Sequence, residues 1–386
     1  MKKQLVLIGG GHAHVHVLKS LTLREPQPFE GVEVTLISPY ARQVYSGMLP
    51  GWVAGHYAIE QCVIPLRPLA ARGDVRFHPV AATKIDFARS VVHCEDGQEI
   101  AFDLLSIDSG PVANLSMVPG LAEHAIAIRP IETFIDSYAA VAGDIDARHR
   151  RGERTRVAFV GAGAGGVELA LAMQHRFRKH DVGVTLISAA NTLPGSVGPR
   201  IARIMRSRGM AVLAGQAAAN VTQAGVRLDS GAMVDADVVI AATGASAADW
   251  PRASGLLTDE HGFILVNEHL QSISHANVFA AGDCATMQQH PRPKSGVYAV
   301  KAGAPLDDNL RRALRGDTLQ RYLPQARSLY LISTGNKYAI GSWGDLAWEG
   351  AWVWHWKDMI DRGFMRKYSL PDNFPHADAD RASPSR

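Results

Sequence analysis

The chain has 386 residues, a length that accommodates two or three domains. Its 40 basic and 37 acidic residues give a formal net charge of +3, so the molecule has no strong field of one sign and no nucleic-acid partner is predicted. Hydrophobic residues make up 47% of the chain and charged residues 20%, which excludes a disordered or fibrous protein and predicts a sizeable core.

The N-terminus begins like a signal peptide, because two lysines precede the apolar run at residues 5–8. Glycines at positions 9–11 interrupt this run and no small-residue cleavage site follows, so we interpret the run as a buried first strand. No long uncharged apolar stretch occurs elsewhere, and a membrane-spanning helix is not expected. A cytoplasmic location is therefore predicted.

The first structural unit consists of that strand, a glycine turn with Gly9 and Gly11, a helix and a second strand at residues 32–38. The third position of the usual G-x-G-x-x-G pattern is His14. One interpretation is a loosened turn with a purely structural role. The other is a helix slightly farther from its strand, with His12, His14 or His16 near the phosphates of a nucleotide. His12 and His16 are four residues apart, but no acidic or cysteine partner lies nearby, and no metal site is predicted.

A second unit of the same kind begins with an apolar strand at residues 157–160. Gly161 permits the tight turn, Gly163 lets the backbone approach a pyrophosphate, and Gly166 allows close packing of helix on strand. A further strand follows at residues 182–188. This strand–turn–helix–strand context makes the glycine motif a strong indication of dinucleotide binding.

The second strand of each unit ends in a serine, Ser38 or Ser188, where an acidic residue usually binds the adenosine ribose. The ordinary signature for selecting NAD over NADP is therefore missing at Ser188. Arg200 and Arg203 either bind a 2′-phosphate or solvate a helix, and the sequence leaves the choice open.

Two later segments complete the pattern. Residues 242–244 (Ala-Thr-Gly) close the second unit, and residues 277–283 form an apolar strand that ends at Gly282-Asp283. With these segments the chain resembles the flavoprotein superfamily with two dinucleotide-binding domains, which includes disulfide reductases, type II NADH dehydrogenases and sulfide:quinone oxidoreductases. The resemblance implies that the first turn holds FAD, the second holds NAD(P)H, and Asp283 holds the ribityl chain.

A closer resemblance is carried by residues 9–15, 45–51, 294–300 and 331–339. These segments are similar to a type II NADH dehydrogenase-like family that in some organisms is fused ahead of selenide, water dikinase. The resemblance extends from residue 3 to about residue 370. No kinase segment is present in the sequence, so its own residues imply no selenium role.

The three cysteines, Cys62, Cys94 and Cys284, lie far apart, which indicates a reducing compartment and excludes a CxxC pair. Disulfide reductases need two neighbouring thiols after the first strand pair, where only Cys62 occurs. Sulfide:quinone oxidoreductases need a pair from the nucleotide domain and the C-terminal third, where no such pair exists. Both thiol chemistries are disfavoured.

The resemblance implies an α/β fold with two Rossmann-like dinucleotide-binding domains and a C-terminal cap. The FAD domain is discontinuous, at residues 1–112 and 250–325, and the NAD(P)H domain is inserted at residues 113–249. The cap covers residues 326–370, and residues 371–386 form a flexible tail rich in polar residues and proline.

The implied function is an FAD-dependent NAD(P)H dehydrogenase that passes electrons to a small-molecule acceptor, for which a quinone is predicted. Two alternatives remain: a flavin-binding redox sensor or partner module, and a soluble reductase with a non-quinone acceptor. Glu168 and Lys301 are the catalytic candidates. The alternative interpretations are that Glu168 is an acid favoured by the dipole at the N-terminus of its helix and that Lys301 is an ordinary helix lysine. The residues predicted to bind the two cofactors are Gly9, Gly11, His12, His14, Ser38, Arg42, Gly110, Gly282, Asp283, Gly161, Gly163, Gly166, Ser188 and Gly244.

Five of the seven tryptophans fall between positions 343 and 356. In a helix with about 100° per residue, one side would carry Trp348, Trp352, Trp356, Met359 and Ile360. Lys357, Asp358, Asp361 and Arg362 would lie mainly opposite, with Trp354 pointing into the polar face. This apolar stripe is either core or dimer packing, or a peripheral contact with the inner face of the membrane, supported by Arg366 and Lys367.

Overall fold

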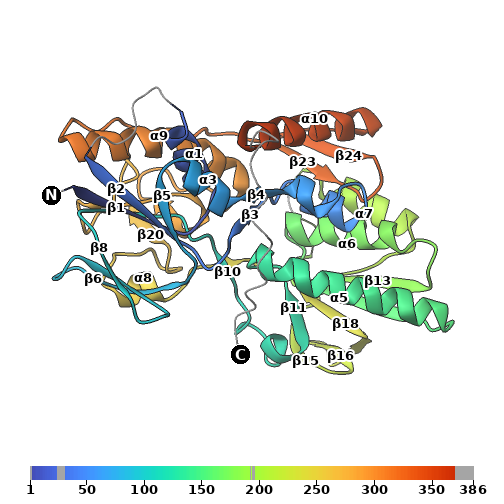
Figure 1. The fold of residues 1–386 in the computed structure, drawn as a ribbon. Coiled ribbons are helices and arrows are strands. Elements are labelled where there is room, and N and C mark those ends of the chain that lie inside the picture. Colours follow the sequence, from blue (N-terminus) through green and yellow to red (C-terminus); the bar gives the residue numbers. More distant parts are fainter. Residues whose placement is uncertain (1, 24–30, 192, 194–195, 370–386) are drawn as a thin grey trace.

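The computed structural model describes residues 2–23, 31–191, 193 and 196–369; the tail predicted at residues 371–386 lies outside them. Two parallel five-stranded sheets lie side by side (Figure 1). This arrangement confirms the predicted α/β class with two Rossmann-like units.

The first sheet has the order β21-β9-β1-β2-β5. Its central strand is buried along most of its length because helices and a second layer cover its two faces, which explains the continuous apolar run at residues 5–8. Helices α1, α3 and α9 lie on one side (Figure 1). The strands are β1 (Lys3–Ile8), β2 (Val32–Ile37), β5 (Val75–His78), β9 (Leu104–Ile107) and β21 (Val278–Ala280), and the helices are α1 (His12–Leu21), α3 (Leu66–Arg72) and α9 (Gly296–Arg315).

The second sheet has the order β11-β18-β12-β13-β14 and is also parallel throughout. Its helices are α5 (Ile131–Arg150), α6 (Ala164–Arg176) and α7 (Gly198–Ser207). Its strands are β11 (Ala125–Ala127), β12 (Thr155–Val160), β13 (Val182–Ser188), β14 (Ala211–Ala214) and β18 (Val238–Ala241).

The central strands of the two sheets occupy equivalent positions. β1 lies between β2 and β9, and its last residue, Ile8, pairs with Ile37 and Ile107. β12 lies between β13 and β18, and its last residue, Val160, pairs with Ile187 and Ala241. Each glycine turn therefore emerges at the carboxyl edge of its sheet, where ligands of open α/β sheets bind.

Two short strands, β10 (Val112–Ala113) and β19 (Ala245–Ser246), pair at the crossings between the sheets. These pairings lie close to the predicted domain limits. Residues 44–54, which the sequence assigned to the FAD domain, contribute several buried side chains to the core of the second sheet, including Leu49 and Val53. The two halves are thus tied by shared core packing as well as by the crossings.

The C-terminal cap consists of a three-stranded antiparallel sheet and the final helix. Its elements are β23 (Leu329–Ser333), β24 (Ala339–Trp343), β25 (Leu346–Gly350) and α10 (Ala351–Tyr368). α10 packs on all three cap strands, and it lies above α6 and α7 in Figure 1.

The predicted tryptophan helix differs from the structure at its start. Trp348 belongs to β25, and α10 begins only at Ala351. The buried side of α10 carries Trp354, Lys357 and Asp361, whereas Trp352, Met359 and Ile360 are exposed, and Trp356 is half-buried. The predicted polar face is therefore largely the packed one, because Lys357 and Asp361 pair with each other inside the cap at 2.6 Å.

The remaining elements complete the two halves. The first half also contains β3 (Arg42–Val44), α2 (Leu49–Val53), the 3₁₀ turns η1 (Ile59–Cys62) and η2 (Gly282–Cys284), β4 (Val63–Pro65), β6 (Ala82–Asp86), β7 (Val91–Cys94), β8 (Glu99–Ala101), α8 (Trp250–Ala253), β20 (Ile264–Val266) and β22 (Ala285–Met287). The second half also contains α4 (Leu121–His124), β15 (Ala218–Thr222), β16 (Gly225–Leu228) and β17 (Met233–Asp235).

Candidate functional site

The first glycine turn is built around the buried side chain of Asp108, which follows β9. Its Oδ2 atom accepts hydrogen bonds from the backbone N–H groups of Ala13 (2.8 Å) and His14 (3.1 Å) in the first turn of α1. A Cβ atom on Gly11 or on Gly282 would overlap this carboxyl group. Burial raises the pKa of Asp108 to about 7, although the two backbone donors favour its charged form.

The His14 side chain fills the space between the first helix and its strand. The matching position of the second unit is Gly166, which lets helix and strand pack without a side chain between them. Its ring is fully buried, with Nδ1 2.6 Å from the Gly9 carbonyl oxygen and Nε2 2.8 Å from the Ser106 hydroxyl. A carbonyl oxygen can only accept, so Nδ1 carries the proton and the serine hydroxyl donates to Nε2. Burial lowers the pKa of His14 to about 4. The structure thus gives His14 the structural role, with a neutral ring that supports the turn from beneath.

His12 begins α1 and lies beside the aromatic rings of Tyr45 and Phe364, at centroid distances of 5.8 and 6.0 Å. Its Nε2 atom is buried and has no hydrogen-bond partner among the described residues. Burial lowers the pKa of His12 to about 4, so the ring is neutral. A buried polar atom of this kind fits a site that a polar ligand completes.

Asp283, in η2, lies where β21 ends beside the first turn. Its carboxylate is 3.6 Å from the Arg129 guanidinium, and its side chain lines a small cavity of about 60 Å³ together with Lys294. Burial raises the pKa of Asp283, while Arg129 and Lys294 oppose that shift. A carboxylate flanked by two cations at the carboxyl edge of a parallel sheet is suited to accept hydrogen bonds from ligand hydroxyls.

The second glycine turn has the geometry that its sequence predicts. Gly161 has φ +111°, a conformation that favours glycine. Gly163 has open space where a Cβ would stand, whereas a Cβ on Gly166 would overlap the Gly161 carbonyl and lie 2.8 Å from the Ala242 side chain. No side chain caps α6. The first backbone N–H groups of α6 are therefore not bonded to a capping side chain, an arrangement suited to binding an anion, whereas two donors of α1 are already bonded to Asp108.

Four other predicted cofactor residues lie near the carboxyl edges of the two sheets. Ser38 and Ser188 are buried, and each donates its hydroxyl to a carbonyl two residues later. Gly110 has φ +72°, and open space surrounds both it and Gly244.

The three arginines singled out in the sequence have protein partners. Arg42, on β3, forms an ion pair of 3.3 Å with Asp136 of α5. Arg200 and Arg203 both pair with Glu349 of β25. All three arginines therefore join separate elements of the chain. Their positions do not decide between NADH and NADPH.

Glu168 lies in the first turns of α6, where that helix meets the cap. Its Oε1 accepts a hydrogen bond of 2.7 Å from the Ser333 backbone N–H. Burial raises the pKa of Glu168 to about 7, and the Lys357 ammonium opposes that shift. Lys357 Nζ also donates to the Gly47 carbonyl oxygen at 2.5 Å, so one cation links α10 to the segment before α2. Sequence reasoning missed Lys357, since its spacing of four from Asp361 is also typical of a solvated helix face.

Lys301 is exposed on α9 and makes none of the hydrogen bonds or ion pairs found among the described residues. The three cysteines are free and buried, and burial raises the pKa values of Cys62, Cys94 and Cys284 to about 12, 11 and 12. Little thiolate exists on any of them at neutral pH, which disfavours thiol chemistry.

Comparison with known proteins places the chain in a family. The family model of the pyridine nucleotide-disulphide oxidoreductases matches residues 3–303, and the chain belongs to this family. It is an oxidoreductase whose cofactors are FAD and NAD(P)H, which fits the two glycine turns and the unpartnered atom on His12.

Similar proteins include the NADH dehydrogenase-like protein YutJ of Bacillus subtilis, which is 26% identical over 350 residues, covering 88% of this chain and 92% of the relative. The demethylphylloquinone reductase NdbB of Synechocystis is 24% identical over 297 residues, covering 74% and 72%. The sulfide:quinone oxidoreductase of Aquifex aeolicus shares the fold, with a TM-score of 0.78 at 18% identity over 95% of this chain and 91% of that chain.

The raised pKa of Glu168 predicts that the free energy of unfolding of this protein depends on pH. The ordinary value of 4.5 applies in the unfolded chain, so the folded protein holds a proton that the unfolded chain releases between about pH 4.5 and pH 7. The contribution of Glu168 to stability is full below pH 4.5 and is lost as the pH rises through 7. Between pH 5 and pH 8 the free energy of unfolding of Glu168→Gln should therefore gain about 2 kcal/mol relative to the unmodified protein.

Urea unfolding at a series of pH values measures this difference, in which the titration of Asp108 cancels because both proteins carry it. Glu260→Gln serves as the control, since Glu260 is exposed. A difference between Glu168→Gln and the unmodified protein that does not change between pH 5 and pH 8 would contradict the assignment.

Proposed function

We propose that this protein is an NAD(P)H dehydrogenase that uses FAD to pass electrons from NAD(P)H to a quinone-like acceptor. The observation that carries the proposal is the position of Glu168, a carboxyl group with a pKa near 7 at the junction of the second nucleotide unit and the cap. The relatives named for NADH dehydrogenase and demethylphylloquinone reductase activity support it. The finer resemblance to the family fused to selenide, water dikinase stays a prediction.

FAD, when bound, accepts a hydride from NAD(P)H and returns the electrons to a second acceptor. We infer that Gly9, Gly11 and Asp283 hold FAD, with His12, Ser38, Arg42, Gly110 and Gly282 around them and His14 supporting the turn from beneath. Gly161, Gly163 and Gly166 hold the pyrophosphate of NAD(P)H, with Ser188 and Gly244 beside them. The free backbone donors at the N-terminus of α6 and the carboxylate of Asp283 support this division.

Quinone reduction takes up two protons, and a hydride carries only one. A carboxyl group with a pKa near 7 can hold a proton and release it at neutral pH, and we assign this role to Glu168. Lys357, beside it, stabilises the carboxylate left behind. We propose that Lys301, exposed on α9, supplies a positive charge that favours the negative charge a bound flavin gains on reduction.

Steady-state oxidation of NADH and of NADPH, each with a water-soluble quinone, tests the function. The purified protein should contain FAD and oxidise at least one nicotinamide cofactor many times faster with quinone than with oxygen alone. Asp283→Ala should lose FAD during gel filtration more readily than Ser38→Ala and recover activity when FAD is added back, because it removes a charged acceptor.

Turnover with a ferredoxin-type protein or with oxygen but not with quinone would favour the soluble reductase. Flavin reduction without turnover on any acceptor would favour the redox sensor. Either result overturns the quinone proposal.

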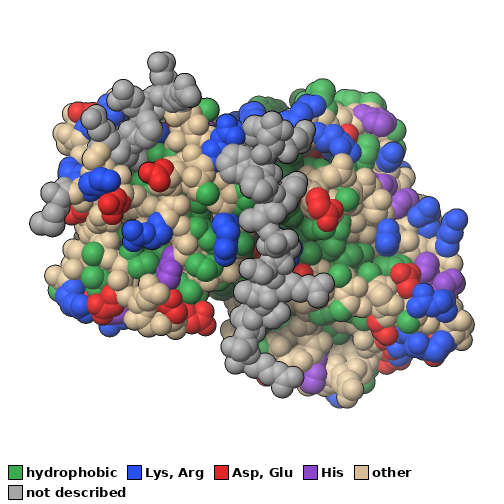
Figure 2. Space-filling view, viewed as in Figure 1, with side chains coloured by type: hydrophobic (Ala, Val, Ile, Leu, Met, Phe, Trp, Pro, Cys, Tyr) green, Lys and Arg blue, Asp and Glu red, His purple; other side chains and the backbone are tan. Residues whose placement is uncertain are grey.

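We further propose that the cap contacts the cytoplasmic surface of the membrane. Trp343, Leu346, Trp352, Met359 and Ile360 are the large exposed apolar residues of the described part of the cap, here called the cap face. Hydrophobic side chains gather along the upper edge of the molecule over α10 (Figure 2). Arg366 and Lys367 are exposed at the end of the same helix. Among the described residues no helix is long and apolar enough to cross a bilayer, so the proposed contact is an interfacial one.

Sedimentation with liposomes that contain anionic lipid tests the cap face. The unmodified protein should co-sediment at low salt, and Trp352→Ser with Met359→Ser should not, because both changes remove exposed apolar area. Met117→Ser is the control, since Met117 is an exposed apolar residue just before α4 and lies outside the cap. Equal sedimentation of all three proteins would contradict the membrane contact. It would also be contradicted if the unmodified protein and the Met117→Ser control were homodimers and the cap-face variant were a monomer.

A further inference from the structure

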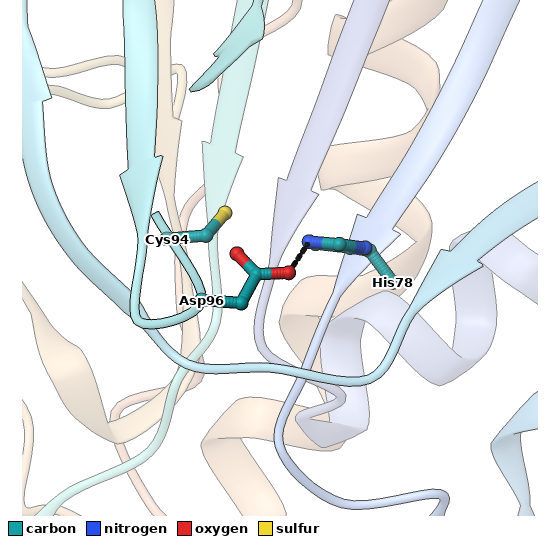
Figure 3. Close-up of side chains that lie close together, drawn as sticks. All are labelled: His78, Cys94 and Asp96. Atoms are coloured by element: carbon teal, nitrogen blue, oxygen red, sulfur yellow. Dashed lines mark ion pairs between the residues drawn. The ribbon is translucent and has the colours of Figure 1, made fainter. Parts of the chain in front are cut away.

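Three side chains with metal-ligand chemistry converge at one end of β5. His78 is the last residue of β5, Cys94 is the last residue of β7, and Asp96 lies in the turn that follows Cys94. Figure 3 shows the carboxylate of Asp96 directed at the His78 ring, with the Cys94 thiol beside it. One ligand atom from each residue lies within 4.8 Å of the other two.

The distance between His78 and Asp96 is that of two ligands on one ion. His78 Nε2 and Asp96 Oδ2 are at ion-pair distance, 3.2 Å apart (Figure 3), yet Nε2 is buried and makes no hydrogen bond among the described residues. His180 and Asp146 provide the contrast, because their 3.0 Å contact is a hydrogen bond. Nitrogen and oxygen ligands at tetrahedral angles on one zinc ion lie about 3.3 Å apart.

We propose that His78, Cys94 and Asp96 bind a divalent cation of the zinc class. An imidazole, a thiolate and a carboxylate together suit Zn²⁺, whereas Mg²⁺ and Ca²⁺ prefer oxygen ligands alone. On binding, the Cys94 S–H bond breaks, its proton passes to solvent, and the sulfur–metal bond forms without any change of oxidation state. Three protein ligands leave a fourth position for water.

The site joins two layers of the first half. His78 belongs to β5 at the edge of the parallel sheet, whereas Cys94 and Asp96 belong to the antiparallel sheet β6-β7-β8. The His78 carbonyl also accepts a hydrogen bond of 3.1 Å from the Ser38 backbone N–H. A cation here therefore stabilises the edge of the sheet beside a residue that we assign to FAD binding.

The test uses the FAD-loaded protein, freed of metal by a chelator and dialysed against Zn²⁺ alone. One zinc ion should bind per chain, and Co²⁺ in its place should give a thiolate-to-cobalt absorption band in the difference spectrum. Cys94→Ser should abolish the band, and Asp96→Asn should weaken Zn²⁺ binding at least tenfold, as expected for loss of a ligand. Cys62→Ser is the matched control, because Cys62 is an equally buried thiol in the same half of the chain.

Asp96 is exposed in a turn, so its variant should fold and retain FAD even where Cys94→Ser does not. The proposal is overturned if the unmodified protein binds no stoichiometric zinc, if Co²⁺ gives no thiolate band, or if Asp96→Asn binds zinc as tightly as the Cys62→Ser control.

Discussion

The arrangement of the first half depends on the hydrogen bonds that the buried carboxyl group of Asp108 accepts. It bonds to two backbone N–H groups of α1, and it leaves room only for glycine at positions 11 and 282. Three segments distant in sequence thereby meet at one point: the first turn, the end of β9 and the segment that carries Asp283. Burying a carboxyl is costly, and the backbone donors at a helix N-terminus offset that cost.

A second buried charge organises the junction with the cap. Lys357 pairs with Asp361 on the same helix, donates to the Gly47 carbonyl, and acts electrostatically on Glu168. Tyr45 also donates its hydroxyl to Asp361 at 3.1 Å. A charge pair inside the cap thus holds α10 against the segment before α2, and it places a cation beside the carboxyl group that we propose handles protons.

The two nucleotide units were predictable from sequence because parallel strands buried on both faces read as continuous apolar runs, and because a glycine turn follows each central strand. Gly161, Gly163 and Gly166 each have the predicted geometry. The role of His14 could not be decided, since either interpretation fits one histidine in place of glycine. Asp108 was missed because a single aspartate after a strand resembles an ordinary turn residue, and its partners come from another part of the chain.

The cap was the part that sequence described least well. Periodicity left open whether the tryptophan stripe is packed or faces a membrane. It also placed Trp348 in the helix, which starts three residues later, and it did not show that the packed side contains a charge pair. A pattern of hydrophobicity cannot show that two opposite charges neutralise each other in a core. The cluster of His78, Cys94 and Asp96 was likewise hidden, because strand pairing, rather than a local motif, brings these residues together.

The central claim is that electrons pass from NAD(P)H through FAD to a quinone-like acceptor without a thiol intermediate. Anaerobic mixing of NADH or NADPH, and then of a water-soluble quinone, with FAD-loaded protein in which Cys62, Cys94 and Cys284 are all serine tests it most directly. The account predicts that flavin absorbance bleaches and that quinone restores it, each as fast as in the unmodified protein, because all three thiols are buried and protonated. A folded, FAD-loaded variant that bleaches but no longer passes its electrons to quinone would contradict it.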